Sequence, residues 1–263
     1  MITFNKIVNK LSKKCWNILF KEDIFDIIDP DKQKKNQNLV DKTIYKLKAQ
    51  KIIITLKSWV YIFPDEEDLK LNEIDLIEKY YLKLLKKYIR FYVWWDYFIA
   101  WNKALEIHLK NFSVPQKINI INRNLNKKIK VWNYEIIFKT VYWNLNWKKT
   151  NLYSKLAKFI SIKNIDWIEF KIANLELSLL QSALVNDLDE WIDIDLLTKA
   201  IKKYSKFFNR DFFEELAKYK FVMSFNRLKE ISKNIDPNLS LFFVEIIKKN
   251  WWLFIGEWLR KIY

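Results

Sequence analysis

The chain has 263 residues, of which 51% are hydrophobic and 30% are charged, a composition typical of a folded protein and not of a disordered one. No apolar run approaches the roughly 18 residues of a membrane-spanning helix, and the first residues, Met1 to Lys6, lack the layout of a signal peptide. We therefore expect a cytoplasmic protein that has no membrane partner. The single cysteine, Cys15, excludes an internal disulfide and is expected to be a packing residue.

The formal net charge of +16 has two explanations. A lysine-rich composition from an AT-rich genome accounts for part of it, since Ile, Asn and Lys have AT-rich codons. A polyanionic partner accounts for it equally well, and charge alone does not separate nucleic acid from an anionic membrane. The positions of the charges along the chain have to decide.

Residues 1–63 carry 13 basic and 6 acidic residues and predict three helices followed by a β-hairpin. Apolar residues recur at helical spacing in the first two stretches, and Asp29-Pro30 ends the second. Two short alternating runs then flank a turn at 56–59. The expected helices span 4–11, 19–28 and 36–50, and the expected strands span 52–55 and 60–63. This order is the layout of a winged helix-turn-helix domain.

Residues 64–78 contain seven acidic residues and one lysine, and we expect an acidic linker there. Residues 79–263 carry 33 basic and 18 acidic residues. Their strands precede most of their helices, which indicates an α+β domain with a helical C-terminal tail. The expected strands are 117–122, a hairpin over 128–141 that turns at 132–133, and 168–173. The expected helices are 80–88, one starting near 101, 176–185, 196–204, 211–219, 225–232 and 239–248.

Glycine and tryptophan are present in unusual numbers. The chain has one glycine, Gly256, where ordinary usage gives roughly 18, and it has 13 tryptophans. Several tryptophans stand where a turn needs glycine, such as Trp59 between two strands and Trp132 inside the expected hairpin. We interpret the gene as one that encodes glycine with UGA, written here as tryptophan. The alternative is a truly Trp-rich protein with almost no residue that takes positive φ cheaply.

The third predicted helix is the strongest candidate site. Lysines precede it, amide side chains open it, and further polar residues lie off its apolar stripe, as in a recognition helix that reads base edges and contacts phosphates. Lys57 is expected at the tip of the wing. The alternative is a lysine-rich winged helix that binds protein. The candidate DNA-binding residues are Lys34, Lys35, Gln37, Asn38, Lys42, Tyr45, Lys46 and Lys57.

Signals for an enzyme are weak. His108 is the only histidine, so triads and histidine-rich zinc sites cannot be assembled, and we expect it on a helix surface or at an interface. With Trp read as Gly, the stretch 143–150 resembles a phosphate loop, but its spacing is wrong. A nucleotidyltransferase pattern would need Trp94-Trp95 and the pair Asp193 and Asp195 close together, although Asp193 also suits a helix N-cap. We expect no catalytic residue, metal or cofactor.

With Trp read as Gly, three stretches resemble the AbiEi family of transcriptional regulators and antitoxins, in the family's order and over nearly the whole chain. Three positions depart from its pattern: Lys103 replaces serine, Leu175 replaces proline and Gln181 replaces aspartate. The stretches are the wing with Ser58-Trp59-Val60-Tyr61, the segment Trp101-Asn102-Lys103-Ala104-Leu105-Glu106 followed by Pro115 and a strand, and Ala173-Asn174-Leu175-Glu176-Leu177-Ser178-Leu179-Leu180.

The resemblance implies a two-domain antitoxin of a type IV toxin–antitoxin system. Its winged helix would repress its own promoter as double-stranded DNA. Its second domain would counteract a nucleotidyltransferase toxin without binding the toxin directly. The net charge of +15 on residues 79–263 suggests an RNA or nucleotide-bearing target, or a second DNA clamp. A stand-alone winged-helix regulator and a nucleotidyltransferase-type enzyme are the alternatives.

Overall fold

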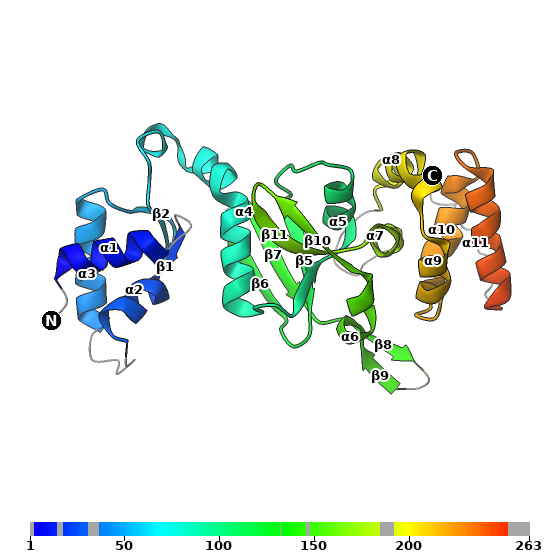
Figure 1. Cartoon of the computed structure of the whole chain (residues 1–263), viewed down its shortest axis with the longest axis horizontal. Helices are drawn as coiled ribbons and strands as arrows, with labels where there is room; N and C mark the ends of the chain where they lie inside the picture. The colour runs from blue at the N-terminus through cyan, green and yellow to red at the C-terminus, as the bar shows by residue number, and fades with distance from the viewer. Residues whose placement is uncertain are drawn as a thin grey trace. The chain divides into compact units, whose positions relative to one another are not determined.

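The computed structural model describes residues 3–14, 18–30, 37–131, 133–145, 148–184 and 192–251. The chain is a mixed α+β protein with a C-terminal helical region, and it divides into two compact units, Met1–Tyr92 and Val93–Tyr263 (Figure 1). Within the described ranges, no helix combines the length and the apolar character needed to cross a membrane.

The first unit begins with helices and a small antiparallel sheet whose strand order is β1-β3-β2. The three expected helices and two expected strands are present, with shifted ends. The elements are α1 (Phe4–Lys14), β1 (Ile18–Phe20), α2 (Lys21–Ile28), α3 (Gln37–Ala49), β2 (Ile54–Lys57), β3 (Val60–Ile62), the short 3-10 helix η1 (Asp68–Lys70) and α4 (Glu73–Tyr92).

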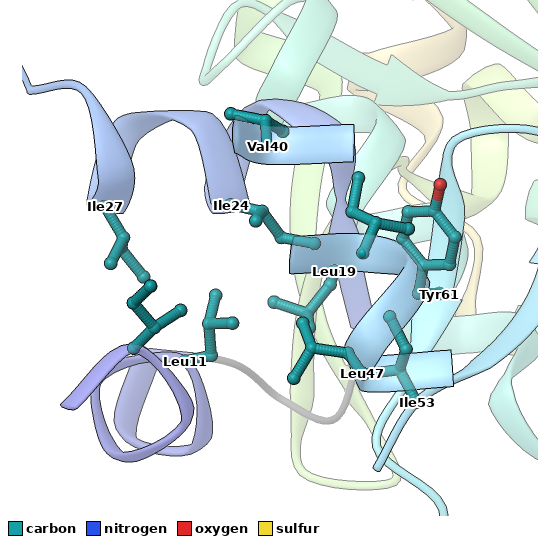
Figure 2. Packing of buried hydrophobic residues seen from close by; sticks show 10 residues of the cluster. Leu11, Leu19, Ile24, Ile27, Val40, Leu47, Ile53 and Tyr61 are labelled. Atoms are coloured by element: carbon teal, nitrogen blue, oxygen red, sulfur yellow. The ribbon is translucent and has the colours of Figure 1, made fainter. Parts of the chain in front are cut away.

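An apolar core joins α1, α2, α3 and the strands. Figure 2 shows side chains from these elements pointing toward one another, and most are fully buried. Burying such aliphatic groups is the main favourable contribution to the stability of this unit. The core fixes which face of each helix points inward. Its members are Ile7, Leu11, Leu19, Ile24, Ile27, Val40, Ile44, Leu47, Ile53 and Tyr61.

Two element boundaries in this unit differ from expectation. The apolar run at 18–20, expected at the start of the second helix, forms β1, and α2 begins only at Lys21. The Asp23 carboxylate accepts a hydrogen bond from the Phe20 N–H at 2.7 Å, which satisfies a donor at the helix start. The strand expected at 52–55 begins at Ile54, because the Ile52 and Ile53 N–H groups donate to the Leu47 carbonyl after the end of α3.

The expected acidic linker at 64–78 lies inside the first unit and is structured. It contains η1 and the start of α4. The Asp68 side chain is fully buried and accepts hydrogen bonds from the Tyr80 hydroxyl at 2.6 Å and from Lys79 Nζ at 2.7 Å. The division between units follows Tyr92 instead. The acidic residues serve local pairing, which their charge pattern alone did not distinguish from a solvated linker.

The second unit is built on a six-stranded mixed sheet with the order β10-β11-β4-β5-β7-β6. The pairs β11–β4 and β5–β7 are parallel and the other pairs are antiparallel. In the central strand β5, Asn119 and Asn122 are buried together with the isoleucines, so both faces of this strand are covered. The strands are β4 (Tyr97–Ile99), β5 (Lys117–Asn122), β6 (Lys127–Val131), β7 (Tyr134–Lys139), β10 (Ile160–Ile165) and β11 (Ile168–Ala173).

Helices α5 and α7 pack against each other and against the sheet. The strands β4, β10 and the separate hairpin β8–β9 were not expected from the sequence, and Trp132 of the expected hairpin turn lies outside the described residues. The further elements are α5 (Trp101–His108), β8 (Tyr142–Leu145), β9 (Lys148–Asn151), α6 (Leu152–Leu156), the 3-10 helix η2 (Ala157–Phe159) and α7 (Leu175–Ser182).

The C-terminal helical region is held together by phenylalanine rings. Phe213 lies at the centre, with ring centroids 5.2 Å from Phe243 and 6.3 Å from Phe225, both in edge-on geometry. All helices expected here are present, each beginning slightly earlier than expected. The elements are α8 (Ile194–Tyr204), the 3-10 helix η3 (Ser205–Phe207), α9 (Arg210–Ala217), α10 (Val222–Ser232) and α11 (Pro237–Lys249).

Candidate nucleic-acid interface

Helix α3 has one buried face and one exposed face. Val40, Thr43, Ile44 and Leu47 recur at helical spacing and are buried in the core of the first unit. Because helix α2 packs against α3, the pair forms two successive helices of which only the second presents a long polar face. The core therefore determines which residues of α3 a partner can reach.

The exposed face of α3 carries most of the candidate residues. Gln37 and Asn38 are exposed in its first turn, and Lys42, Tyr45 and Lys46 are exposed along its length. Tyr45 has 74% of its surface accessible, which is high for an aromatic side chain. The structure thus brings five of the eight candidates onto one helix surface. Lys34 and Lys35 lie outside the described residues.

The lysines of this face are not neutralised by neighbouring acids. Among the residues that the structure describes, Lys42, Lys46 and Lys48 form no ion pair. The one acidic residue of α3, Asp41, is already paired, because its Oδ1 lies 2.7 Å from Lys21 Nζ on α2. The exposed face of α3 therefore presents positive charge together with amide and phenol groups.

Lys57 differs from the expected wing tip. It is the last residue of β2 and is half-buried, and this burial lowers the pKa of its amine. The tip of the hairpin is formed by Ser58 and Trp59, since Lys57 pairs with Val60 across the turn. Trp59 is 61% exposed, and Lys21 Nζ lies 6.0 Å from the centre of its ring.

Lys21 is a site residue that sequence reasoning missed. It links the two neighbouring parts of the candidate interface, through its ion pair with Asp41 on α3 and through its N–H, which donates to the Trp59 carbonyl at 3.0 Å. The sequence placed Lys21 inside a helix and gave no sign of either contact. The nearby Tyr61 has its pKa raised by burial and then by the charges of Asp41 and Glu22.

The alternative catalytic patterns take structural roles in the second unit. Asp193 caps α8, because its Oδ1 accepts a hydrogen bond from the Leu196 N–H at 2.8 Å. The stretch that resembled a phosphate loop lies in the hairpin β8–β9, without the strand-loop-helix order that such a loop needs. His108 is half-buried, with Nε2 2.9 Å from the Ala173 carbonyl oxygen, and burial lowers its pKa. Cys15 lies outside the described residues.

A cleft of about 530 Å³ lies at the start of α5. Its lining includes Lys103, Glu106, Lys117, Asn119 and Asp193. The Lys103 side chain is almost fully buried and donates to Glu106 Oε2 at 2.9 Å and to the Ser113 carbonyl. Its charge is thus compensated within the second unit. The exposed face of α3 remains the strongest candidate for binding a polyanion.

The chain was also compared with known proteins. No protein-family model matches it, and no curated protein matches it. The geometry of α3 and of the β2–β3 turn therefore carries the functional argument.

Proposed function

We propose that residues 1–63 form a winged helix-turn-helix that binds double-stranded DNA, with α3 as recognition helix and the β2–β3 turn as wing. The observation that carries this proposal is the exposed face of α3, where amides precede lysines that have no acidic partner among the described residues. Asn38 at the start of the helix would reach base edges, while Lys42 and Lys46 would pair with phosphates.

The order of elements supports this assignment. Helix α2 packs beside α3, and the antiparallel strands β2 and β3 follow directly, as a wing follows a recognition helix. The half-buried Lys57 has a smaller role in this arrangement than the sequence indicated. We expect the exposed turn at 58–59 to approach the sugar-phosphate backbone instead.

A salt titration of DNA binding tests the proposal. The full chain should bind the duplex upstream of its gene with an affinity that falls steeply as salt rises. The double variant Lys42→Ala/Lys46→Ala should bind more weakly and lower the log–log salt slope by about two, since each lost phosphate contact removes about 0.9. An unchanged slope in this variant would overturn the assignment of α3.

A matched control separates position from net charge. The double variant Lys218→Ala/Lys233→Ala removes the same two charges from exposed positions in the C-terminal helices. We expect it to bind DNA with the affinity and the slope of the unmodified chain. Equal weakening in both variants would mean that net charge, and not the exposed face of α3, holds the DNA.

We further propose that the chain is an autorepressor and an antitoxin that counteracts a nucleotidyltransferase toxin, as the resemblance to the AbiEi family implies. The stretches that carry the resemblance fall on corresponding kinds of element, because Trp101 begins α5 and Leu175 begins α7. If the neighbouring gene encodes no such toxin, the function reduces to that of a transcriptional regulator.

Growth rescue tests the antitoxin role independently of repression. Cells that express the neighbouring toxin should recover when they also express the full chain from an unrelated promoter. The Lys42→Ala/Lys46→Ala variant should rescue equally well if protection resides in the second unit. If only the unmodified chain rescues growth, DNA binding is required and the second unit is not a separate protective domain.

A further inference from the structure

The tryptophans occupy an unusual region of backbone conformation. The structure describes the backbone of seven tryptophans, and five of them have φ between 54° and 69°. Only four other described residues have positive φ. In this left-handed region the Cβ of an L-residue crowds a carbonyl oxygen, and glycine avoids the clash because it has no Cβ. The five residues are Trp59, Trp94, Trp101, Trp167 and Trp251.

The hairpin between β10 and β11 gives the sharpest case. Ile165 pairs with Ile168, so the turn consists of Asp166 and Trp167 alone. Both have positive φ, at 48° and 65°, which defines a type I′ turn. The favoured pairs for this turn are Asn-Gly and Asp-Gly. Trp167 stands at the glycine position, and its side chain is fully exposed.

The turn between β2 and β3 repeats this arrangement. Lys57 pairs with Val60, and Trp59, the second of the two turn residues, has φ 69° and is 61% exposed. Two-residue hairpin turns commonly require glycine where φ is positive. No apolar neighbour explains why a large aromatic side chain would be placed at this tip, since its described ring contact is with Lys21.

Two further tryptophans follow the ends of helices. Trp251 has φ 54°, comes directly after the C-cap residue Asn250 of α11, and donates its N–H to the Lys248 carbonyl at 3.0 Å. Trp94 has φ 54° and comes two residues after α4 ends. Glycine is the residue most favoured at the left-handed position that terminates a helix. Both side chains are more than half exposed.

The fifth case lies at the start of a helix. Trp101 is the first residue of α5, yet it has φ 55°, which no ordinary helical residue has. Unlike the other four side chains it is buried. A glycine there would let the chain turn from β4 into α5 without a Cβ in the bend. All five tryptophans thus occupy positions where the backbone, and not the packing, favours glycine.

We infer that the native protein has glycine at these five positions, because the gene encodes glycine with UGA. One glycine and 13 tryptophans together approach the ordinary glycine content of a chain of this length. The structure adds what composition lacks, since it separates Trp95, which has ordinary φ, from its neighbour Trp94. This inference does not depend on the proposed DNA binding.

The direct test reads the codons and the native peptides. We expect UGA at positions 59, 94, 101, 167 and 251 of the gene. We expect peptides of the protein purified from its own organism to have the mass of glycine there. UGG codons, or peptides with the mass of tryptophan, would overturn the inference.

A stability experiment tests the backbone argument separately. Trp101 is left unchanged, because removing a buried side chain can prevent folding. In the full chain, glycine at the four exposed positions should raise the melting temperature by roughly 10 °C, through relief of left-handed strain. Alanine at the same four positions removes the same exposed rings but keeps the Cβ, so it should raise the melting temperature much less. Equal increases for both variants would overturn the backbone argument.

Trp95→Gly is the matched control at an adjacent position with ordinary φ. Glycine there should lower the melting temperature slightly, because it only adds conformational freedom to the unfolded chain. A rise as large as that of Trp94→Gly would show that removal of any exposed tryptophan stabilises the protein. That result would contradict the assignment of glycine by backbone conformation.

Discussion

Helix α3 and strand β6 are both rich in lysine, but their surroundings differ. On α3, the lysines at 42, 46 and 48 form no ion pair with any described residue. On β6, Lys128 Nζ lies 2.8 Å from Glu135 Oε2 on the neighbouring strand, and Lys127 and Lys130 also have partners. Strand β6 is an edge of its sheet, where lysines discourage pairing with another chain. The neighbouring residues therefore decide whether a lysine-rich element can bind a polyanion or only protects a sheet edge.

The largest expected effect comes from the buried side of α3. Leu47→Ala removes a fully buried side chain and should lower the free energy of unfolding of the first unit by about 2–5 kcal/mol. Loss of this anchor should also weaken DNA binding, because the core orients the exposed face. Denaturant unfolding followed by circular dichroism, combined with a DNA-binding assay, measures both effects.

Leu228→Ala is the matched control, since Leu228 is equally buried in α10 of the second unit. We expect a comparable loss of stability and unchanged DNA affinity under conditions where the chain is folded. If this variant weakens DNA binding as much as Leu47→Ala does, the interface is not confined to the first unit.

Asp68→Asn should produce the next largest effect. Burial by itself raises the pKa of the Asp68 carboxyl, but hydrogen bonds from Lys79, Tyr80 and the Asp65 N–H outweigh it and lower the pKa below its usual value. Removing the charge from this fully buried group should cost about 1–3 kcal/mol near neutral pH. Urea unfolding at several pH values measures this cost.

The sign of the pH dependence follows from the lowered pKa. The stabilisation is fully present above the carboxyl pKa of the unfolded chain, near 4, and is lost as the pH falls through the lower value of the folded chain. The difference between Asp68→Asn and the unmodified chain should therefore shrink below about pH 4. A difference that stays constant down to pH 2 would mean that Asp68 contributes shape and not charge.

Sequence reasoning predicted the elements whose patterns are long and local. Helices α3, α8 and α11 repeat buried side chains over several turns, and β11 alternates cleanly. Strands β1 and β4 could not be recognised, because each has three residues, all buried by neighbours distant in sequence. A short apolar run such as 18–20 has no period that separates a strand from a helix.

The candidate site was predicted to the same extent and for the same reason. The exposed face of α3 follows from helical periodicity, so Asn38, Lys42 and Tyr45 are exposed as expected. The half-burial of Lys57 and the pairing of Lys21 with Asp41 depend on how separate elements pack, and no local pattern encodes such contacts. The turn residues were an exception, because an excess of tryptophan at turns is visible in the sequence itself.

Asn38→Ala should have a smaller effect that separates the two kinds of contact on α3. Removing an amide that reads a base edge should reduce discrimination between promoter and scrambled duplex by about 1–3 kcal/mol. The salt slope should stay unchanged, because no phosphate contact is lost. Lys42→Ala is the opposite control and should change the slope while leaving discrimination intact. Identical behaviour of the two variants would contradict separate base and phosphate contacts.

Glu135→Gln should have the smallest effect, and it tests the comparison between α3 and β6 directly. Interaction with Lys128 lowers the pKa of Glu135, despite some opposing desolvation, and the charges of Lys117 and Lys130 act in the same direction. The variant raises the net charge by one and leaves Lys128 without this partner. Such exposed pairs contribute little to folding, so we expect a nearly unchanged melting temperature above pH 5 and no difference at lower pH, where Glu135 is protonated in the unmodified chain.

DNA affinity gives the decisive comparison for this variant. Glu135→Gln adds one positive charge to the protein, whereas Lys42→Ala removes one. If net charge sets the affinity, the two variants should shift DNA binding by similar amounts in opposite directions. If the unpaired face of α3 sets it, Lys42→Ala should weaken binding and Glu135→Gln should leave it unchanged, because β6 belongs to the second unit. Fluorescence anisotropy of a labelled promoter duplex at fixed salt distinguishes these outcomes. Tighter binding by Glu135→Gln would show that freeing a lysine anywhere on the surface is enough to create a DNA contact.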